Sequence, residues 1–305
     1  MAADSTGNAA AGDRAPDCLD VRVGEIDYRL YGWGDPDGEP VWLLHGWGDT
    51  GLSFQFLAAA LLSGSPKPLR LLAPDWRGFG ASGRPQGRYW FPDYLADLDA
   101  LLSRFNPGDA VTLVGHSMGG NIAGLYAGVR PERVRHLVSL EGFGLAPRDA
   151  SEAPDHLSLW LDQVSAPPAL RTFDSEAALV AYLQRRMPEA SAARARFIAR
   201  AWADAGEDGR WTLKMDPRHK LVNPVLYRRE EAQACWRQAT ADVLLVSGGA
   251  SPFGENVLKQ GLDALLASCF GAYRHLNIGG AGHMLHIEHP EAIAEATLAL
   301  MAGRD

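Results

Sequence analysis

A serine in the first half of the chain lies within a glycine-flanked turn that suits a nucleophile. Ser117 is the central residue of Gly115–Gly119, which reads Gly-His-Ser-Met-Gly. The apolar run Val111–Val114 before it predicts a strand, and Asn121–Val129 after it predicts a helix. In this context the two small glycines allow a sharp turn, and the strained serine exposes its hydroxyl above the sheet edge. The pattern therefore predicts acyl-transfer chemistry with Ser117 as the nucleophile.

A serine hydroxyl needs a base to remove its proton, and a histidine near the end of the chain is placed for this role. His283 ends the glycine-rich loop Gly279–His283, between a predicted strand at 273–278 and a predicted helix at 290–301. Imidazole is the side chain whose pKa suits proton transfer near neutral pH. We predict that His283 is the base, with His286 as the alternative.

A second glycine-rich turn, His45–Asp49, follows the predicted strand Val41–Leu44. Acyl transfer builds negative charge on the carbonyl oxygen of the substrate, and backbone N–H groups stabilise that charge. The glycines would let this turn pack close to the nucleophile. We predict an oxyanion hole formed by the backbone N–H groups of Trp47 and Met118.

These segments together resemble the α/β-hydrolase superfamily, in the branch that carries a helical cap. In addition, Asp75–Gly83 resembles the D-x-R-G-x-G-x-S segment that follows the fourth strand of the family. The histidine loop at Gly282 and His283 also matches, and the similarity covers roughly residues 18–142 and 241–303 in the family's order. The resemblance implies an α/β fold with a mostly parallel eight-stranded sheet flanked by helices, and a helical cap inserted after the sixth strand.

The acidic partner of the histidine departs from the commonest pattern of this superfamily. Many relatives carry an aspartate in a turn after the seventh strand, where this chain has Ser251. A serine cannot balance the charge of an imidazolium, so a carboxylate has to come from another segment. Glu255, four residues later, is one alternative.

Glu141 is the predicted acid. It directly follows the predicted strand His136–Leu140 and lies 24 residues after Ser117 (141 − 117). Parallel strands joined by one helix lie side by side, so their carboxyl ends are close. Haloalkane dehalogenases and zearalenone lactonases, which this architecture resembles, place the acid at this position. We therefore predict a triad of Ser117, His283 and Glu141.

The rest of the chain divides into elements that would hold these residues. Short apolar strands alternate with helices over residues 18–142 and 241–305, which predicts an α/β core with a mostly parallel sheet. An early hairpin, Val21–Val23 with Ile26–Tyr31, would add an antiparallel edge. Residues 1–17 are rich in alanine, glycine and aspartate and predict a disordered leader.

Between residues 143 and 240 the alternation stops, and helix-like segments predict a cap over the site. One short extended piece, Trp211–Met215, interrupts them. The predicted cap helices are Asp155–Gln163, Ser175–Arg186, Ser191–Ala205 and Val225–Arg237. The substrate pocket should lie between Ser117 and this cap. We select Trp47, Trp160, Tyr227 and Trp236 as its wall residues, from six aromatic candidates that also include Trp202 and Trp211.

A serine nucleophile under an aromatic-rich cap predicts hydrolysis of a carboxylic ester or lactone of a medium-sized hydrophobic small molecule. Similar haloalkane dehalogenases and epoxide hydrolases use a carboxylate nucleophile, so Ser117 argues against their chemistry. C–C bond hydrolysis of ring-cleavage products, thioesterase or amidase activity, and a slow-turnover receptor or cofactor-free lyase on the same triad remain alternatives. The chemistry requires no cofactor or metal.

The composition limits the partners of the protein. The formal net charge is −8, from 29 basic and 37 acidic residues, which gives no electrostatic reason to bind nucleic acid or an anionic membrane. The sequence has no transmembrane-length apolar run and no signal-peptide pattern, and its three separated cysteines predict neither a disulfide framework nor a zinc site. We expect a cytoplasmic enzyme whose partner is its substrate, with the oligomeric state left open.

Overall fold

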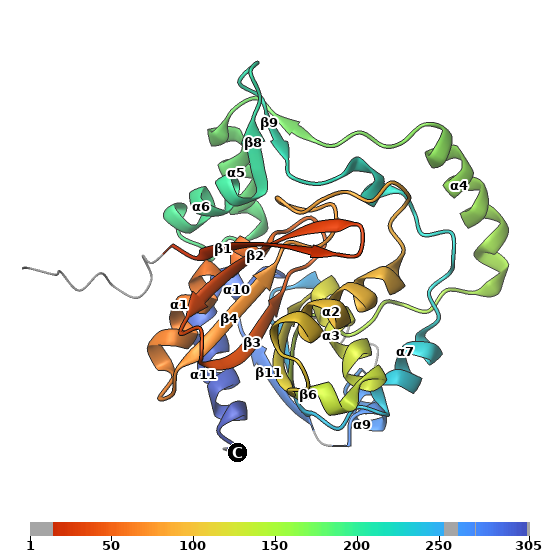
Figure 1. Cartoon of the computed structure of the whole chain (residues 1–305). Helices are drawn as coiled ribbons and strands as arrows, with labels where there is room; N and C mark the ends of the chain where they lie inside the picture. Colours follow the sequence, from red (N-terminus) through yellow and green to blue (C-terminus); the bar gives the residue numbers. More distant parts are fainter. Residues whose placement is uncertain (1–14, 253–261, 272, 304–305) are drawn as a thin grey trace, which may run out of the picture.

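A mostly parallel sheet of eight strands forms the centre of the molecule (Figure 1). The computed structural model describes residues 15–252, 262–271 and 273–303. The strand order is β1-β2-β4-β3-β5-β6-β10-β11, in which β2 runs antiparallel to both neighbours and the other pairs are parallel. This arrangement confirms the predicted α/β class. The strands are β1 (Asp17–Val23), β2 (Ile26–Gly34), β3 (Glu39–Leu44), β4 (Leu69–Pro74), β5 (Val111–His116), β6 (Val134–Leu140), β10 (Asp242–Gly248) and β11 (Tyr273–Ile278).

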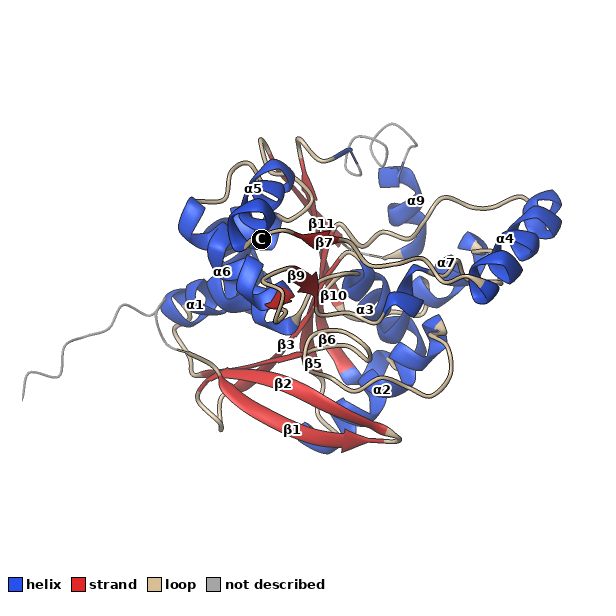
Figure 2. Ribbon diagram, turned by 90° about the horizontal axis from the view of Figure 1, so that it is seen from above, coloured by secondary structure: helices blue, strands red, loops and turns tan. Residues whose placement is uncertain are grey.

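Helices cover both faces of this sheet (Figure 2). On β3, Val41 and Leu43 point into the cluster that contains helices α1 and α11, whereas Trp42 and Leu44 point into the cluster that contains α2, α3 and α9. All four side chains are fully buried, which explains why the strand is apolar without alternation. The helices are α1 (Gln55–Gly64), α2 (Phe91–Phe105), α3 (Met118–Val129), α9 (Leu262–Cys269), α10 (Leu285–Glu288) and α11 (Pro290–Met301).

The carboxyl ends of the central strands lie at one edge of the sheet. Leu44 of β3 lies opposite Gly115 of β5. His116 of β5 lies opposite Leu140 of β6, which in turn lies opposite Val246 of β10. The loops after β3, β5 and β6 carry the predicted site residues Trp47, Ser117 and Glu141. The parallel order therefore gathers residues that are far apart in the sequence.

The segment between β6 and β10 is called the inserted segment below (green to cyan in Figure 1). Its strands form a small antiparallel sheet in the order β7-β9-β8. The predicted helix Ser191–Ala205 is wrong at its end, because Ala203–Ala205 pairs with β9 instead of continuing the helix. The elements are α4 (Ala153–Ser165), β7 (Thr172–Phe173), α5 (Glu176–Arg186), α6 (Ala192–Trp202), β8 (Ala203–Ala205), β9 (Trp211–Leu213) and α7 (Arg229–Trp236).

Residues 1–14 of the predicted leader lie outside the described residues, and Asp17 pairs with Gly32 at the start of β1. In the part of the chain that the structure describes, none of the helices has the length and apolar character needed to cross a bilayer.

Candidate active site

Ser117 lies at the turn between β5 and α3, in a backbone conformation that few residues adopt. Its φ is 51° and its ψ is −113°. The Ser117 N–H donates to the carbonyl of Leu140 in β6 at 2.8 Å, which fixes the turn against the next strand. Glycines make the turn possible, since a Cβ on Gly119 would lie 2.0 Å from the carbonyl oxygen of Leu44. A Cβ on Gly115 would likewise meet the Gly119 carbonyl at 2.4 Å.

Glu141 and His283 lie in hydrogen-bond contact although 142 residues separate them. The Oε2 atom of Glu141 is 2.6 Å from Nδ1 of His283. Glu141 is fully buried and has a positive φ of 54°, and its own N–H donates to the carbonyl of Val246 in β10 at 2.9 Å. The carboxylate therefore occupies a fixed place between the ends of β6 and β10.

This contact determines which nitrogen of His283 can act as a base. An ionised carboxylate only accepts hydrogen bonds, so Nδ1 of His283 donates to Glu141. The lone pair of the neutral ring is then on Nε2, the nitrogen that can accept a proton. The carbonyl of His283 accepts a hydrogen bond at 2.8 Å from Nε2 of His116, the residue next to Ser117. The histidine loop is thus attached directly to the turn that carries the serine.

Ser251 is a hydrogen-bond partner of Glu141, the predicted acid. Its hydroxyl donates to Oε2 of Glu141 at 2.6 Å, and the N–H of Gly248 donates to Oε1 at 2.8 Å. Ser251 is fully buried. The alternative acid, Glu255, lies outside the described residues.

The turn after β3 is shaped by His45. The N–H of Trp76 can only donate, so Nε2 of His45 accepts it at 2.8 Å, and Nδ1 donates to the carbonyl of Gly46 at 2.8 Å. In a trans peptide the carbonyl of Gly46 and the N–H of Trp47 point in opposite directions, so the Trp47 N–H points away from His45. A Cβ on Gly46 would lie 3.1 Å from Cβ of Ser117, which shows how closely this turn passes the serine.

Met118, the other predicted oxyanion donor, is the first residue of α3. Backbone N–H groups in the first turn of a helix have no acceptor within the helix and carry the positive end of its dipole. The turn that holds Ser117 thus places such a group directly after the serine. The oxyanion roles of Met118 and Trp47 stay predictions.

Burial of His45 has a consequence for acid stability. Because burial disfavours the charged imidazolium, the pKa of His45 is lowered from 6.5 to about 4. Below pH 6.5 the unfolded chain binds a proton at this ring and the folded chain does not. We therefore expect the free energy of unfolding to fall by about 3 kcal/mol through His45 as the pH drops from 6.5 to 4. Urea unfolding at a series of pH values measures this loss.

The matched variant for this measurement is His45→Gln. The amide keeps an acceptor for the Trp76 N–H and a donor for the Gly46 carbonyl, but it does not titrate. The variant should lose less stability than the wild type between pH 6.5 and 4. Equal losses in the two proteins would contradict the assignment of this acid sensitivity to His45.

Two of the four predicted wall residues lie at or beside a cavity of about 260 Å³. Trp160 of α4 lines it. Trp47 is 53% exposed, and its indole N–H donates at 3.2 Å to the carbonyl of His219, which also lines the cavity. The remaining lining residues are Arg88, Tyr89, Trp90, Arg218, Leu221, Val222, Asn223, Pro224 and Val225.

The other two predicted wall residues lie against the core. Trp236 is 3% exposed and stacks on Phe270, with ring centroids 6.0 Å apart. Tyr227 is half-buried, and its hydroxyl would lie 2.7 Å from a Cβ placed on Gly144. The structure therefore does not bring these two residues together with Trp160, and their contact with a substrate stays a prediction.

His286, Asp49 and His116 are buried beside the site, and only His286 was assigned a role from the sequence. His286, the alternative base, is fully buried, and its Nε2 lies 3.3 Å from Oδ2 of Asp49. Asp49 and His116 were not assigned any role. Their positions gave a signal, because Asp49 ends the glycine-rich turn and His116 directly precedes the serine.

Comparisons with known proteins agree with this architecture. A family model described as alpha/beta hydrolase fold matches residues 39–290. A serine hydrolase-like protein of Danio rerio is 27% identical over 273 residues, which cover 86% of this chain and 81% of that protein. The esterase YbfF of Escherichia coli is 28% identical over 192 residues, which cover 62% of this chain and 66% of that protein.

Solved structures show the same fold. A thioesterase domain from the curacin biosynthetic pathway superimposes with a TM-score of 0.82 and covers 94% of this chain and 100% of its own. Its sequence identity of 24% supports a shared fold and no more.

Proposed function

The chain belongs to the α/β-hydrolase fold family and is a hydrolase, and from this premise we propose that it cleaves a carboxylic ester or lactone through an acyl-enzyme formed on Ser117. The single observation that carries the proposal is the 2.6 Å contact between Glu141 and His283, whose loop is attached to the turn of Ser117. Acyl transfer requires a serine within reach of a histidine that a carboxylate orients.

Acylation begins when the Ser117 oxygen attacks the carbonyl carbon of the substrate and Nε2 of His283 takes the hydroxyl proton. The imidazolium that forms is stabilised by Glu141, which holds Nδ1 at 2.6 Å. The negative charge that develops on the substrate oxygen is stabilised by the N–H groups of Met118 and Trp47. His283 then gives its proton to the leaving alcohol oxygen as the carbon–oxygen bond breaks.

Deacylation repeats these roles with water. His283 takes a proton from a water molecule, whose oxygen attacks the acyl carbon, and the ester bond to Ser117 breaks. The Ser117 oxygen recovers its proton from His283, and the carboxylic acid leaves. For a lactone the alcohol and the acid are parts of one product molecule.

The proposed substrate is a small molecule with an apolar acyl or alcohol part. Leu221, Val222, Pro224 and Val225 line the cavity beside Trp160, and Trp47 links this cavity to the turn after β3. Apolar walls with a few polar groups are typical of small-molecule sites.

Hydrolysis of p-nitrophenyl esters from acetate to decanoate tests the proposal. We expect turnover preceded by a burst of one p-nitrophenolate per chain, because acylation releases the phenolate before water completes the cycle. Absence of both burst and turnover over the whole series, and with simple lactones, would rule the proposal out.

The role of the cavity is tested with Trp160→Ala in the same series. Removing the indole should raise KM for octanoate and decanoate by about tenfold and leave acetate within about twofold, because only the longer chains reach the cavity wall. An equal change for acetate and decanoate would mean that the acyl chain does not lie along Trp160.

A further inference from the structure

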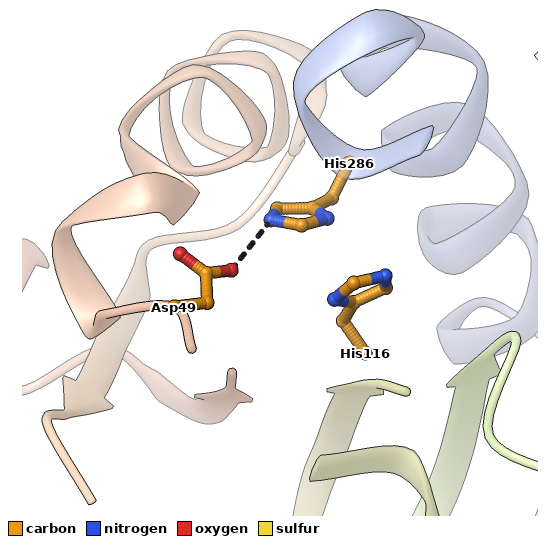
Figure 3. A group of neighbouring side chains, drawn as sticks. All are labelled: Asp49, His116 and His286. Atoms are coloured by element: carbon orange, nitrogen blue, oxygen red, sulfur yellow. Dashed lines mark ion pairs between the residues drawn. The ribbon is translucent and has the colours of Figure 1, made fainter. Parts of the chain in front are cut away.

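Asp49, at the end of the turn after β3, is a buried carboxylate that joins three parts of the molecule. Its Oδ1 atom accepts hydrogen bonds from the Thr50 N–H at 2.7 Å and from the indole N–H of Trp202 at 2.5 Å. Its Oδ2 atom accepts from the Ser53 hydroxyl at 2.9 Å and lies 3.3 Å from Nε2 of His286 (Figure 3). Burial alone would raise the pKa of Asp49, but the hydrogen bond from His286 and those from further donors hold it below its ordinary value.

His116 connects this group to the catalytic histidine. The carbonyl of His283 only accepts, so Nε2 of His116 carries the hydrogen of their 2.8 Å contact. Burial lowers the pKa of His116 well below its ordinary value, which keeps the ring neutral. The centroid of the His116 ring lies 4.8 Å from that of His283 and 4.4 Å from that of His286.

Asp49, His116 and His286 are residue types that also bind transition metals, and one ligand atom from each lies within 4.8 Å of the others. However, both Asp49 oxygens already have two donors each. Nε2 of His286 has to carry a hydrogen to donate to Asp49, so this nitrogen has no lone pair to offer a metal in this arrangement. The contacts therefore favour a hydrogen-bonded network over a metal centre.

We propose that Asp49 is a positioning residue that holds the turn after β3 and the histidine loop in one catalytic geometry. We also propose that Trp202 makes this geometry depend on the packing of the inserted segment against these loops. The inference rests on the proposed acyl-transfer function of the site.

The elements that meet at Asp49 explain the proposal. Thr50 and Ser53 belong to the chain directly after the turn that carries Trp47. His286 lies in α10, which begins two residues after His283. Trp202 is the last residue of α6 in the inserted segment, and its neighbours in that segment pack on Met284 and Ile287 of the same loop and helix.

Removal of the indole N–H of Trp202 should therefore loosen the turn after β3 and the histidine loop together. A catalytic group displaced by about 1 Å can lose on the order of 10²-fold in rate. Loss of one of the four hydrogen bonds to Asp49 leaves three in place, so we expect kcat to fall by less than this factor. The effect should fall on kcat rather than on KM, because Trp202 does not line the cavity proposed for the substrate.

The first experiment compares Trp202→Phe with the matched control Trp33→Phe. Trp33 is a buried tryptophan whose indole N–H donates to Gln55 at 2.9 Å and not to Asp49. With p-nitrophenyl acetate, Trp202→Phe should lower kcat about tenfold with KM within about twofold, whereas Trp33→Phe should lower Tm without this loss of kcat. If both variants lower Tm and neither lowers kcat, Trp202 has only a structural role and the proposal fails.

The second experiment does not need enzyme activity. In Asp49→Asn the amide oxygen can still accept from Thr50 and Trp202, but its NH₂ group faces Nε2 of His286. That nitrogen also lies 3.2 Å from the Ser53 hydroxyl, so two donors can meet it and we expect the ring hydrogen to move to Nδ1. Nitrogen-15 NMR of the imidazoles should show the tautomer of His286 reversed and the His283 signals shifted. Unchanged His283 signals in both Asp49→Asn and Trp202→Phe would overturn the proposal. If the wild type hydrolyses no ester but the two variants show these shifts, the proposed function is refuted and the link between Asp49 and His283 still stands.

Discussion

Replacing Glu141 by glutamine is expected to lower kcat for ester hydrolysis by about 10⁴-fold. The amide can still accept from the Gly248 N–H, but its NH₂ group then faces Nδ1 of His283, which also carries a hydrogen. The ring has to reverse its tautomer, which places a hydrogen on Nε2 and removes the lone pair that takes the serine proton. Steady-state kinetics with p-nitrophenyl acetate measure the loss, and Tm checks that the variant is folded.

Ser251→Ala is the matched control for this variant. It removes one neutral hydrogen bond to Glu141 and leaves the carboxylate and its contact with His283 in place. Such a bond contributes about 0.5–1.5 kcal/mol, so we expect a decrease in kcat of about tenfold or less. A Glu141→Gln variant as active as Ser251→Ala would mean that the acid lies elsewhere, and Glu255 would be the next residue to replace.

The proximity of Ser251 to Glu141 also predicts a rescue. In the double variant Glu141→Gln with Ser251→Asp, a carboxylate returns at a position whose side chain contacts residue 141 in the wild type. We expect kcat to recover by about tenfold or more over Glu141→Gln alone. Without recovery, the path of the main chain after β10 in this protein would not let a carboxylate at 251 reach His283.

Ser117→Ala is expected to abolish ester turnover, with a decrease in kcat of about 10⁶-fold, because no covalent intermediate can form. The phenolate burst should disappear, and a fluorophosphonate probe that labels the wild type should leave the variant unlabelled. The alanine adds no bulk at this turn, so Tm should stay close to that of the wild type. Labelling of Ser117→Ala at another residue would place the nucleophile elsewhere.

Local signals in the sequence were sufficient for the main architecture and for the serine turn. The unalternating apolar strands predicted burial on both faces, and Val41 to Leu44 are indeed buried from both sides. Gly115 and Gly119 flank Ser117 because neighbouring carbonyls leave no room for a Cβ, a steric demand that can be read from the residue types alone.

The role of Glu141 could be predicted from the sequence only in part. Sequence order could place it at the carboxyl end of the strand next to that of Ser117, because consecutive parallel strands are neighbours. The order of strands did not say whether its side chain would reach His283. That contact depends on the positive φ of Glu141 and on the packing of β10 beside β6.

Tertiary structure alone decided the supporting contacts. Ser251 donates to a carboxylate 110 residues away, and Trp202 donates to Asp49 across 153 residues. Nothing in the local sequence around Asp49 or Trp202 encodes this hydrogen bond. The same limit applies to Ala203–Ala205, where pairing with β9 overrode a helical pattern.

The sequence by itself therefore determined the fold class, the strained serine turn, and the segments that would supply a base and an acid. These features follow from hydrophobic periodicity and from steric demands within a few residues. Only the tertiary structure decided which donors surround Glu141, which residues hold the histidine loop, and which aromatic side chains line the cavity. The physical reason is that hydrogen-bond partners and cavity walls are set by how distant segments pack, and packing depends on all of the segments together.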